Sequence, residues 1–234
     1  MGWFISGFQA PLIIQRKQVK RINIRVTWNG KVVVSVPTEV SDEVIERVLR
    51  KRADWISKKL EEMETRREQL PLPYQFVDGE TLWILGKPVT LKVVNGRRDK
   101  VGLKGRRLMV KVAESGGGKV RQTIVKWMQE QALKVVGEKV EEFAEVLGVK
   151  PERIELRDWK GKWGLCNTSK GVLRFNWRLA QLPESLIDYI VIHELAHLRY
   201  PRHNGNFWAL VSKVAPDWKA RHKELKKWAG ALMW

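Results

Sequence analysis

The sequence predicts an α+β protein, with a basic front half rich in β-hairpins and a back half dominated by helices around a small sheet. Three observations support this class. Alternating apolar residues with Gly-containing turns recur before residue 115, apolar residues at helical spacing dominate after residue 119, and the run SGGG at 115–118 separates them. We therefore predict a β-rich basic N-terminal subdomain with one long helix over residues 1–115, and a second domain over residues 119–234.

The front half contains the predicted hairpins. Alternating apolar and polar residues mark five candidate strands, at residues 19–28, 31–36, 81–85, 89–94 and 107–112. Asn29-Gly30 is the strongest short hairpin signal, and Gly86-Lys87-Pro88 makes a second turn. Ser41 can cap one helix, whose apolar residues from Val44 to Leu60 follow helical spacing.

The back half begins with a helix over residues 120–147, which Gly148 ends. Residues 152–157 and 172–177 have the composition of strands, and we expect strand 172–177 to form the edge of a small sheet. The Gly- and polar-rich segment around 163–167 is typical of a turn. These elements predict a core in which helix 120–147 packs on a second helix over residues 183–200.

The composition bounds the class of protein. The 234 residues include 44 Lys plus Arg and 26 Asp plus Glu, a formal net charge of +18 at pH 7. This excess indicates a polyanion such as nucleic acid, a nucleotide or an anionic membrane surface, or else only a solvated, self-repelling surface. A single cysteine excludes an internal disulfide and a zinc site built from several cysteines.

Positive charge is concentrated in two parts of the chain. Residues 81–111 hold one acid, Asp99, and nine basic residues: Lys87, Lys92, Arg97, Arg98, Lys100, Lys104, Arg106, Arg107 and Lys111. Residues 199–234 are also rich in Lys and Arg. The excess is therefore expected on the second hairpin region and on the C-terminal helices.

The N-terminus carries no recognisable targeting signal. Residues 1–14 are apolar but lack the basic start and the small-residue cleavage site of a secretory signal, so we interpret them as a first strand or arm. No run reaches the about 18–20 apolar residues that a membrane span needs. We expect a cytoplasmic protein without a membrane anchor.

Three of the four histidines lie in one short segment that contains the pattern H-E-x-x-H. His193 and His197 are one helical turn apart, so both imidazoles project from one face and can bind one metal ion. Glu194 lies about 100° round the helix, where it can reach a water molecule at the metal. Pro183 near the start and Tyr200-Pro201 at the end are correct helix boundaries. The pattern predicts one catalytic zinc ion with Glu194 as general base.

A third protein ligand is expected, because a catalytic zinc binds three side chains and keeps one position open. His203 follows the end of the helix and can fold back toward the metal. Glu224 on the last helix is the competing candidate, and His222 is a weaker one. Without a metal, the motif would be a chance match on a helix with solvated or packed histidines.

The back half resembles the YgjP-like metallopeptidase family, which is related to SprT-like and other zincin domains. The matching segments are KWGLC at 162–166, LRFNWRL at 173–179, HELAHLRYPRH at 193–203 and NFW at 206–208. Front features match too, including ADWI at 53–56, so the similarity covers nearly the whole chain. The resemblance implies a zincin-like metallopeptidase core, zinc bound by His193, His197 and His203, and Glu194 as catalytic base. Lys162 and Leu165 stand where the family usually has Arg and Ser.

We predict a zinc-dependent metallopeptidase acting on peptides or proteins, with Cys166 a small buried residue near the site. Two alternatives stay open. The basic segments could hold phosphates for a metal-dependent phosphohydrolase of nucleotides or nucleic acid, or the protein could be a basic nucleic-acid-binding protein with a non-catalytic metal site. If residues 81–111 form a wall facing His193, a phosphate substrate is favoured. If they face away, they are a docking surface.

Overall fold

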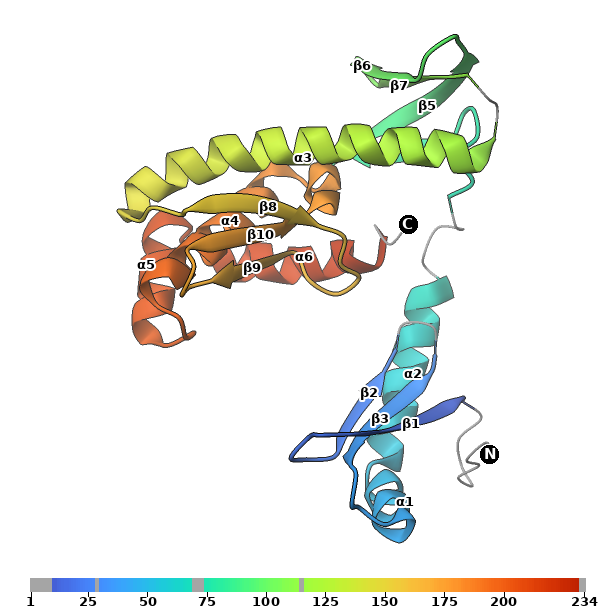
Figure 1. Ribbon diagram of the computed structural model, residues 1–234, viewed down its shortest axis with the longest axis vertical. Helices are drawn as coiled ribbons and strands as arrows, with labels where there is room; N and C mark the ends of the chain where they lie inside the picture. Colours follow the sequence, from blue (N-terminus) through green and yellow to red (C-terminus); the bar gives the residue numbers. More distant parts are fainter. Residues whose placement is uncertain (1–9, 28–29, 69–73, 114–115, 232–234) are drawn as a thin grey trace. The chain divides into compact units, whose positions relative to one another are not determined.

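The chain forms two compact units, residues 1–71 and 72–234, and the α+β class is confirmed. The computed structural model describes residues 10–27, 30–68, 74–113 and 116–231 (Figure 1). Most of the predicted N-terminal arm therefore lies outside the described residues. The division that the sequence suggested near residue 115 falls inside the second unit, because the strand before it and the helix after it share one hydrophobic core.

The first unit packs two helices on a three-stranded sheet. The strands are β1 (Leu12–Lys17), β2 (Asn23–Val26) and β3 (Val32–Pro37). β3 lies in the centre, parallel to β1 and antiparallel to β2, as the first predicted hairpin requires. The one helix expected after Ser41 is two, α1 (Asp42–Lys51) and α2 (Ala53–Glu68), because the backbone of Arg52 leaves helical geometry with φ −109° and ψ 9°. Val34, Ile45 and Ile56 are fully buried between these layers.

The second unit begins with a four-stranded sheet. Its strands are β4 (Thr81–Ile84), β5 (Lys87–Asn95), β6 (Lys100–Lys104) and β7 (Arg107–Val112), in the order β4-β5-β7-β6. One face packs on the first half of the long helix α3 (Gly117–Leu147), where Leu91 and Val110 meet Ile124 and Met128. The sequence did not predict β6, because a strand with lysines at both ends and a glycine between has little apolar alternation.

The hairpin between β4 and β5 is fastened to the body of the second unit at its tip. Leu85 and Gly86 have positive φ, and their N–H groups donate to the carbonyls of Ala180 and Gln181 at 2.8 and 3.0 Å. A Cβ on Gly86 would lie 2.8 Å from the Cα of Pro183. Glycine is therefore required for this close approach, which joins the sheet to the start of the next helix.

A second, three-stranded sheet consists of β8 (Arg153–Arg157), β9 (Gly164–Asn167) and β10 (Val172–Asn176), in the order β8-β10-β9. Two expectations were wrong. Residues 164–167 form a strand rather than a turn, and β10 is central, because it pairs with β8 on one side and β9 on the other. A four-residue strand that begins with glycine is too short for its alternation to be detected.

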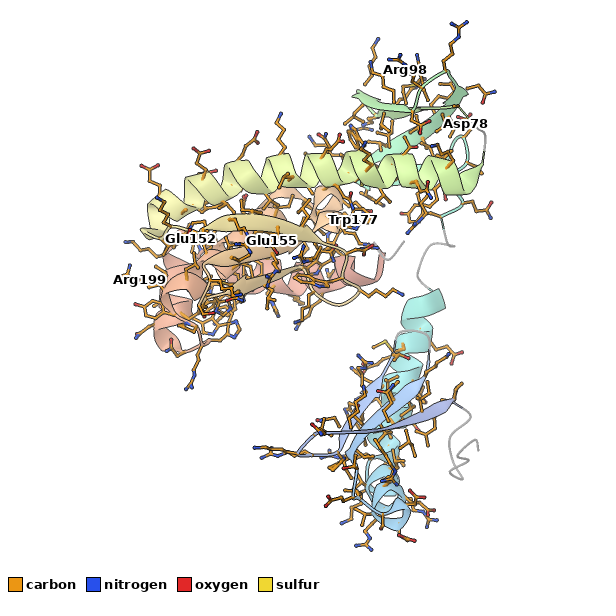
Figure 2. The ribbon with its side chains drawn as sticks, viewed as in Figure 1. Asp78, Arg98, Glu152, Glu155, Trp177 and Arg199 are labelled. Carbon is orange, nitrogen blue, oxygen red and sulfur yellow. The ribbon has the colours of Figure 1, made fainter. Side chains whose placement is uncertain are left out.

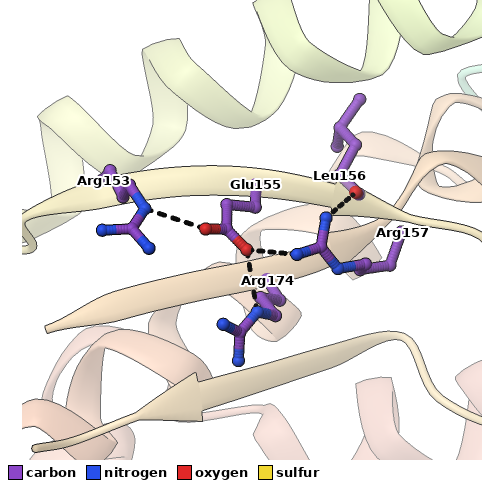
Figure 3. A network of polar contacts seen from close by, with 5 residues as sticks. All are labelled: Arg153, Glu155, Leu156, Arg157 and Arg174. Atoms are coloured by element: carbon purple, nitrogen blue, oxygen red, sulfur yellow. Dashed lines mark hydrogen bonds and ion pairs between the residues drawn. The ribbon is translucent and has the colours of Figure 1, made fainter. Parts of the chain in front are cut away.

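The β8–β10 sheet has one apolar face and one polar face. On the apolar face, Leu173 and Phe175 are buried and pack toward the helices. On the polar face, Glu155 accepts hydrogen bonds from three arginines (Figure 3), namely Arg153 at 2.8 Å, Arg157 at 2.5 Å and Arg174 at 2.9 Å. These ion pairs hold the pKa of Glu155 down to about 2, chiefly through the hydrogen bond from Arg153.

Three helices complete the second unit, after the short 3₁₀ helix η1 (Trp177–Gln181). They are α4 (Glu184–Arg199), α5 (Gly205–Val214) and α6 (Trp218–Ala231). The second half of α3 packs on α4, with Val136, Val140 and Ile190 in one core, as predicted. Among the helices that the structure describes, none is long and apolar enough to cross a membrane.

Candidate active site

The structure brings three of the predicted site residues together. His193 and His197 lie one turn apart on α4, and His203 lies in the loop that follows it. Each offers one ring nitrogen, and these three atoms lie within 4.8 Å of one another. The Nε2 atoms of His193 and His203 are 3.0 Å apart. Three imidazoles thus converge on one point from a helix and the following turn.

Local sequence explains why His203 reaches this point. Tyr200 leaves helical geometry with φ −128° and ψ 96°, and Pro201 follows it. Asn204 then caps α5, its side chain accepting a hydrogen bond from the N–H of Phe207 at 3.0 Å. The end of one helix and the start of the next are therefore only a few residues apart, and His203 lies between them.

Aromatic side chains from α5 and α6 support the histidines. The ring of Phe207 lies 4.6–5.0 Å from all three imidazoles, centroid to centroid. Trp208 stacks on His203 at 5.6 Å and on Trp218 at 3.9 Å. Trp218 is itself fixed by a 2.9 Å hydrogen bond from its ring N–H to the Ser212 hydroxyl. Because its neighbours are packed rings, the cluster is rigidly positioned.

The environment keeps the buried histidines neutral. Burial lowers the pKa of His193 to about 3, and the neighbouring His197, His203 and His222 add to this effect. Burial also lowers the pKa of His197, whose Nδ1 lies 3.2 Å from the carbonyl oxygen of Tyr200. Neutral imidazole is the form that binds a metal ion, and such a contact at the second ring nitrogen orients a ligand histidine. The three ring nitrogens, which lie within 4.8 Å of one another, could therefore hold one metal ion.

Glu194 is buried against the edge strand β9, with 7% of its surface exposed. A Cβ on Gly164 would lie 2.5 Å from the Glu194 Oε1 atom, so glycine is required at this contact. The N–H of Cys166 donates to the carboxylate. Burial raises the pKa of Glu194 to about 8, against the opposing effects of this hydrogen bond and of the Lys162 charge. The sequence did not predict the contact between Gly164 and Glu194, because the pattern around Trp163-Gly164 indicates a turn rather than a strand.

Comparison with known proteins identifies the family of this chain. The family model of the YgjP-like metallopeptidase domain matches residues 20–228. The chain belongs to the YgjP-like metallopeptidase family. Among solved structures, the metallopeptidase zymogen abylysin of Pyrococcus abyssi is 26% identical, with a TM-score of 0.39, and the match covers 42% of this chain and 99% of that chain. No curated protein matches.

Among the described residues, the other candidate ligands of this YgjP-like chain do not join the group of three histidines. Glu224 is exposed on α6, and within the described residues it does not belong to the group of converging ligand atoms. His222 is also exposed, and its Nδ1 lies 3.2 Å from the hydroxyl of Tyr189. The ring of Tyr189 in turn packs 6.0 Å from that of His193. His222 therefore lies near His193, whose pKa it helps to lower, but among the described residues it does not belong to the group of converging ligand atoms.

Cys166 of the YgjP-like chain is half-buried beside Glu194. Burial, and then the Glu194 charge, raise the pKa of its thiol to about 11. A nucleophilic or metal-binding cysteine is instead a thiolate with a lowered pKa. Its side chain is therefore a small packing residue, and its backbone N–H makes the contact to Glu194.

Proposed function

We propose that this protein is a zinc-dependent metallopeptidase in which His193, His197 and His203 bind zinc and Glu194 is the general base. Family membership supports a metallopeptidase. One structural observation carries the finer assignment: three imidazoles converge beside a carboxyl group that the adjacent edge strand holds in place.

The chemistry divides between the ion and this chain's own residues. Zinc at the three histidines would polarise the scissile carbonyl and lower the pKa of a water molecule. A divalent cation near Glu194 also favours its ionised form, against the effect of burial. The Glu194 carboxylate then accepts a proton from the attacking water and later passes it to the leaving amine. Gly164 and the N–H of Cys166 keep that carboxylate in one position during both transfers.

The strand beside Glu194 offers a place for an extended peptide. β9 is an edge of the β8-β10-β9 sheet, with Leu165 at its surface, 36% exposed. An extended substrate can add to such an edge as a further strand, held by main-chain hydrogen bonds. Because Gly164 on this strand contacts Glu194, a peptide bound along the edge would lie close to the base and the histidines.

The position of the basic hairpins favours a peptide over a phosphate substrate. Figure 2 shows Arg98, beside these strands, and Arg199, at the end of α4, at opposite ends of the second unit. The strands pack on α3 around Ile124, whereas α4 packs on it around Val140. These α3 residues are about 24 Å apart at the helical rise of about 1.5 Å per residue. The basic segment 81–111 therefore does not line the histidine site.

The test measures zinc content and turnover in wild type and in Glu194→Gln. We expect the wild type to bind one zinc ion and to cleave casein. Glu194→Gln should retain zinc but lose activity by about 10²- to 10⁴-fold, the usual effect of removing a general base. His203→Ala should lose zinc, whereas Glu224→Gln, the matched change at the competing ligand, should keep both zinc and activity.

Three results would contradict the proposal. Loss of zinc in Glu224→Gln with zinc retained in His203→Ala would overturn the ligand set. Full casein turnover by Glu194→Gln would exclude it as the base. Turnover of a nucleoside triphosphate without casein cleavage would favour the phosphohydrolase instead.

A further inference from the structure

The β4–β7 sheet has one face that is not covered by α3. In β7, Leu108, Val110 and Val112 point into the core, so Arg107, Met109 and Lys111 occupy the other face. The strand registers place on the same side Thr90, Lys92 and Val94 of β5 and Lys100, Gly102 and Lys104 of β6. We call these nine positions the open face; they hold five cations and no acid.

The cations of the open face are exposed and mostly unpaired. Lys92 has an internal partner, Asp78, at 2.8 Å. The single acid of the segment, Asp99, contacts Lys119 of α3 at 2.7 Å. Among the described residues, no carboxylate lies within 4 Å of the other open-face cations, Lys100, Lys104, Arg107 and Lys111, or of the neighbouring turn residues Arg97, Arg98 and Arg106.

The arrangement of these cations weakens the fold. Lys100 lies directly opposite Lys111, and Lys104 lies directly opposite Arg107. Like charges at facing positions of neighbouring strands are destabilising. A sheet that carries two such pairs on one face gains most when an anion binds across them.

We infer that the open face binds the phosphate backbone of a nucleic-acid duplex. Lys100 and Lys104 are about 13 Å apart along β6, at the strand rise of about 3.3 Å per residue. A duplex carries a phosphate about every 3.4 Å of its axis on each strand, so cations at this spacing can contact several phosphates together.

The side chains of the open face argue against other polyanions. Single-strand binders stack bases on aromatic rings, and none of the nine open-face positions is aromatic. Trp83 of β4 lies on the same side of the sheet, but it packs against Trp228 of α6, with ring centroids 5.2 Å apart. Insertion into a membrane surface needs a large apolar face, whereas the open face has only Val94 and Met109, both partly covered. Backbone binding to a duplex needs cations alone, and it is the use that these side chains favour.

The test measures binding of the full-length protein to a fluorescent 20-bp DNA duplex over a range of salt concentrations. The variant is the triple change Lys104→Gln, Arg107→Gln and Lys111→Gln. Its matched control, Lys134→Gln, Lys150→Gln and Lys170→Gln, removes the same charge from exposed positions elsewhere in the second unit. Thermal unfolding and circular dichroism establish that both triples are folded.

We expect wild type and control to bind with the same steep salt dependence. Three lost phosphate contacts should lower the slope of log K against log salt by about 2.7 and the affinity by about tenfold or more. Equal losses in the two triples, tighter binding of the single strand, no duplex binding even at low salt, or binding only to phosphatidylserine vesicles would each overturn the inference. Binding is measured without turnover, so this result is independent of the peptidase proposal.

Discussion

The two sheets of the second unit both carry cations on their outer faces but neutralise them differently. On the β8–β10 sheet, Glu155 lies among three arginines and accepts a hydrogen bond from each. On the β4–β7 sheet, lysines face lysine and arginine across the strands. One nearby acid, Asp78, pairs with Lys92, and the other, Asp99, contacts Lys119 of α3. A count of basic residues therefore does not locate a binding surface. Cations that have no partner within the protein are the better guide to such a surface.

The largest difference between the sheets should appear when a glycine of each is changed to alanine. Gly164 of β9 contacts the Glu194 carboxyl, whereas a Cβ on Gly102 of β6 would meet open space. We expect Gly164→Ala to lower kcat by about 100-fold, because a small displacement of a catalytic group has that effect. Zinc content should stay at the wild-type level, since the histidines are not displaced. Gly102→Ala, assayed in parallel on casein, is the matched control, and unchanged kcat in Gly164→Ala would show that the contact does not position the base.

Zinc should stabilise one sheet and not the other. Metal that binds only the folded chain raises the free energy of unfolding by about 2.7 kcal/mol at 100 times the dissociation constant. Hydrogen exchange with and without zinc should show the increased protection in α4 and β9, beside the histidines. A similar increase in β6 and β7 would contradict a site confined to the histidine cluster.

Acid should weaken the β8–β10 sheet through Glu155. Its pKa in the folded chain is about 2, below its ordinary value of 4.5, chiefly because of the hydrogen bonds from Arg153 and then Arg174. The stability from this group is therefore complete above pH 4.5 and is lost as the pH falls toward about 2. Glu155→Gln should lower stability at neutral pH and flatten the decline between pH 4.5 and 2. Urea unfolding at several pH values measures this, and equal slopes in both proteins would contradict it.

The smallest expected effect comes from a substitution that gives the open face a carboxylate of its own, as Glu155 does for the β8–β10 sheet. Met109 lies between Lys92 on β5 and Gly102 on β6, and the next residues of its own strand on this face, Arg107 and Lys111, are basic. Met109→Glu should raise the free energy of unfolding by about 0.2–1 kcal/mol, the usual worth of an opposite-charge pair across strands. It should also weaken duplex binding. Met109→Gln separates charge from shape, and equal binding by the two variants would mean that the phosphates do not contact this face.

Helix periodicity made much of the second unit predictable. The helix expected at 183–200 is α4, residues 184–199, and the one expected at 120–147 is α3, residues 117–147. Both have long apolar patterns and clear ends. β6 and β9 were not predicted, because they are short, contain glycine and owe their strand structure to pairing with β7 and β10. Such pairing depends on residues distant in sequence or across a turn, which a local pattern does not contain.

By itself, the sequence determined that His193 and His197 share one helix face with Glu194 beside them, since helical geometry places residues four apart together. It also determined the positive charge. Only the tertiary structure decided which candidate ligand lies beside that pair, because the path of a loop depends on packing against Phe207 and its neighbours. The fold likewise decided that Gly164 contacts Glu194, and that, among the described residues, most cations on the outer face of one sheet have no carboxylate partner. Both depend on which strand faces which helix, and the folded core determines that.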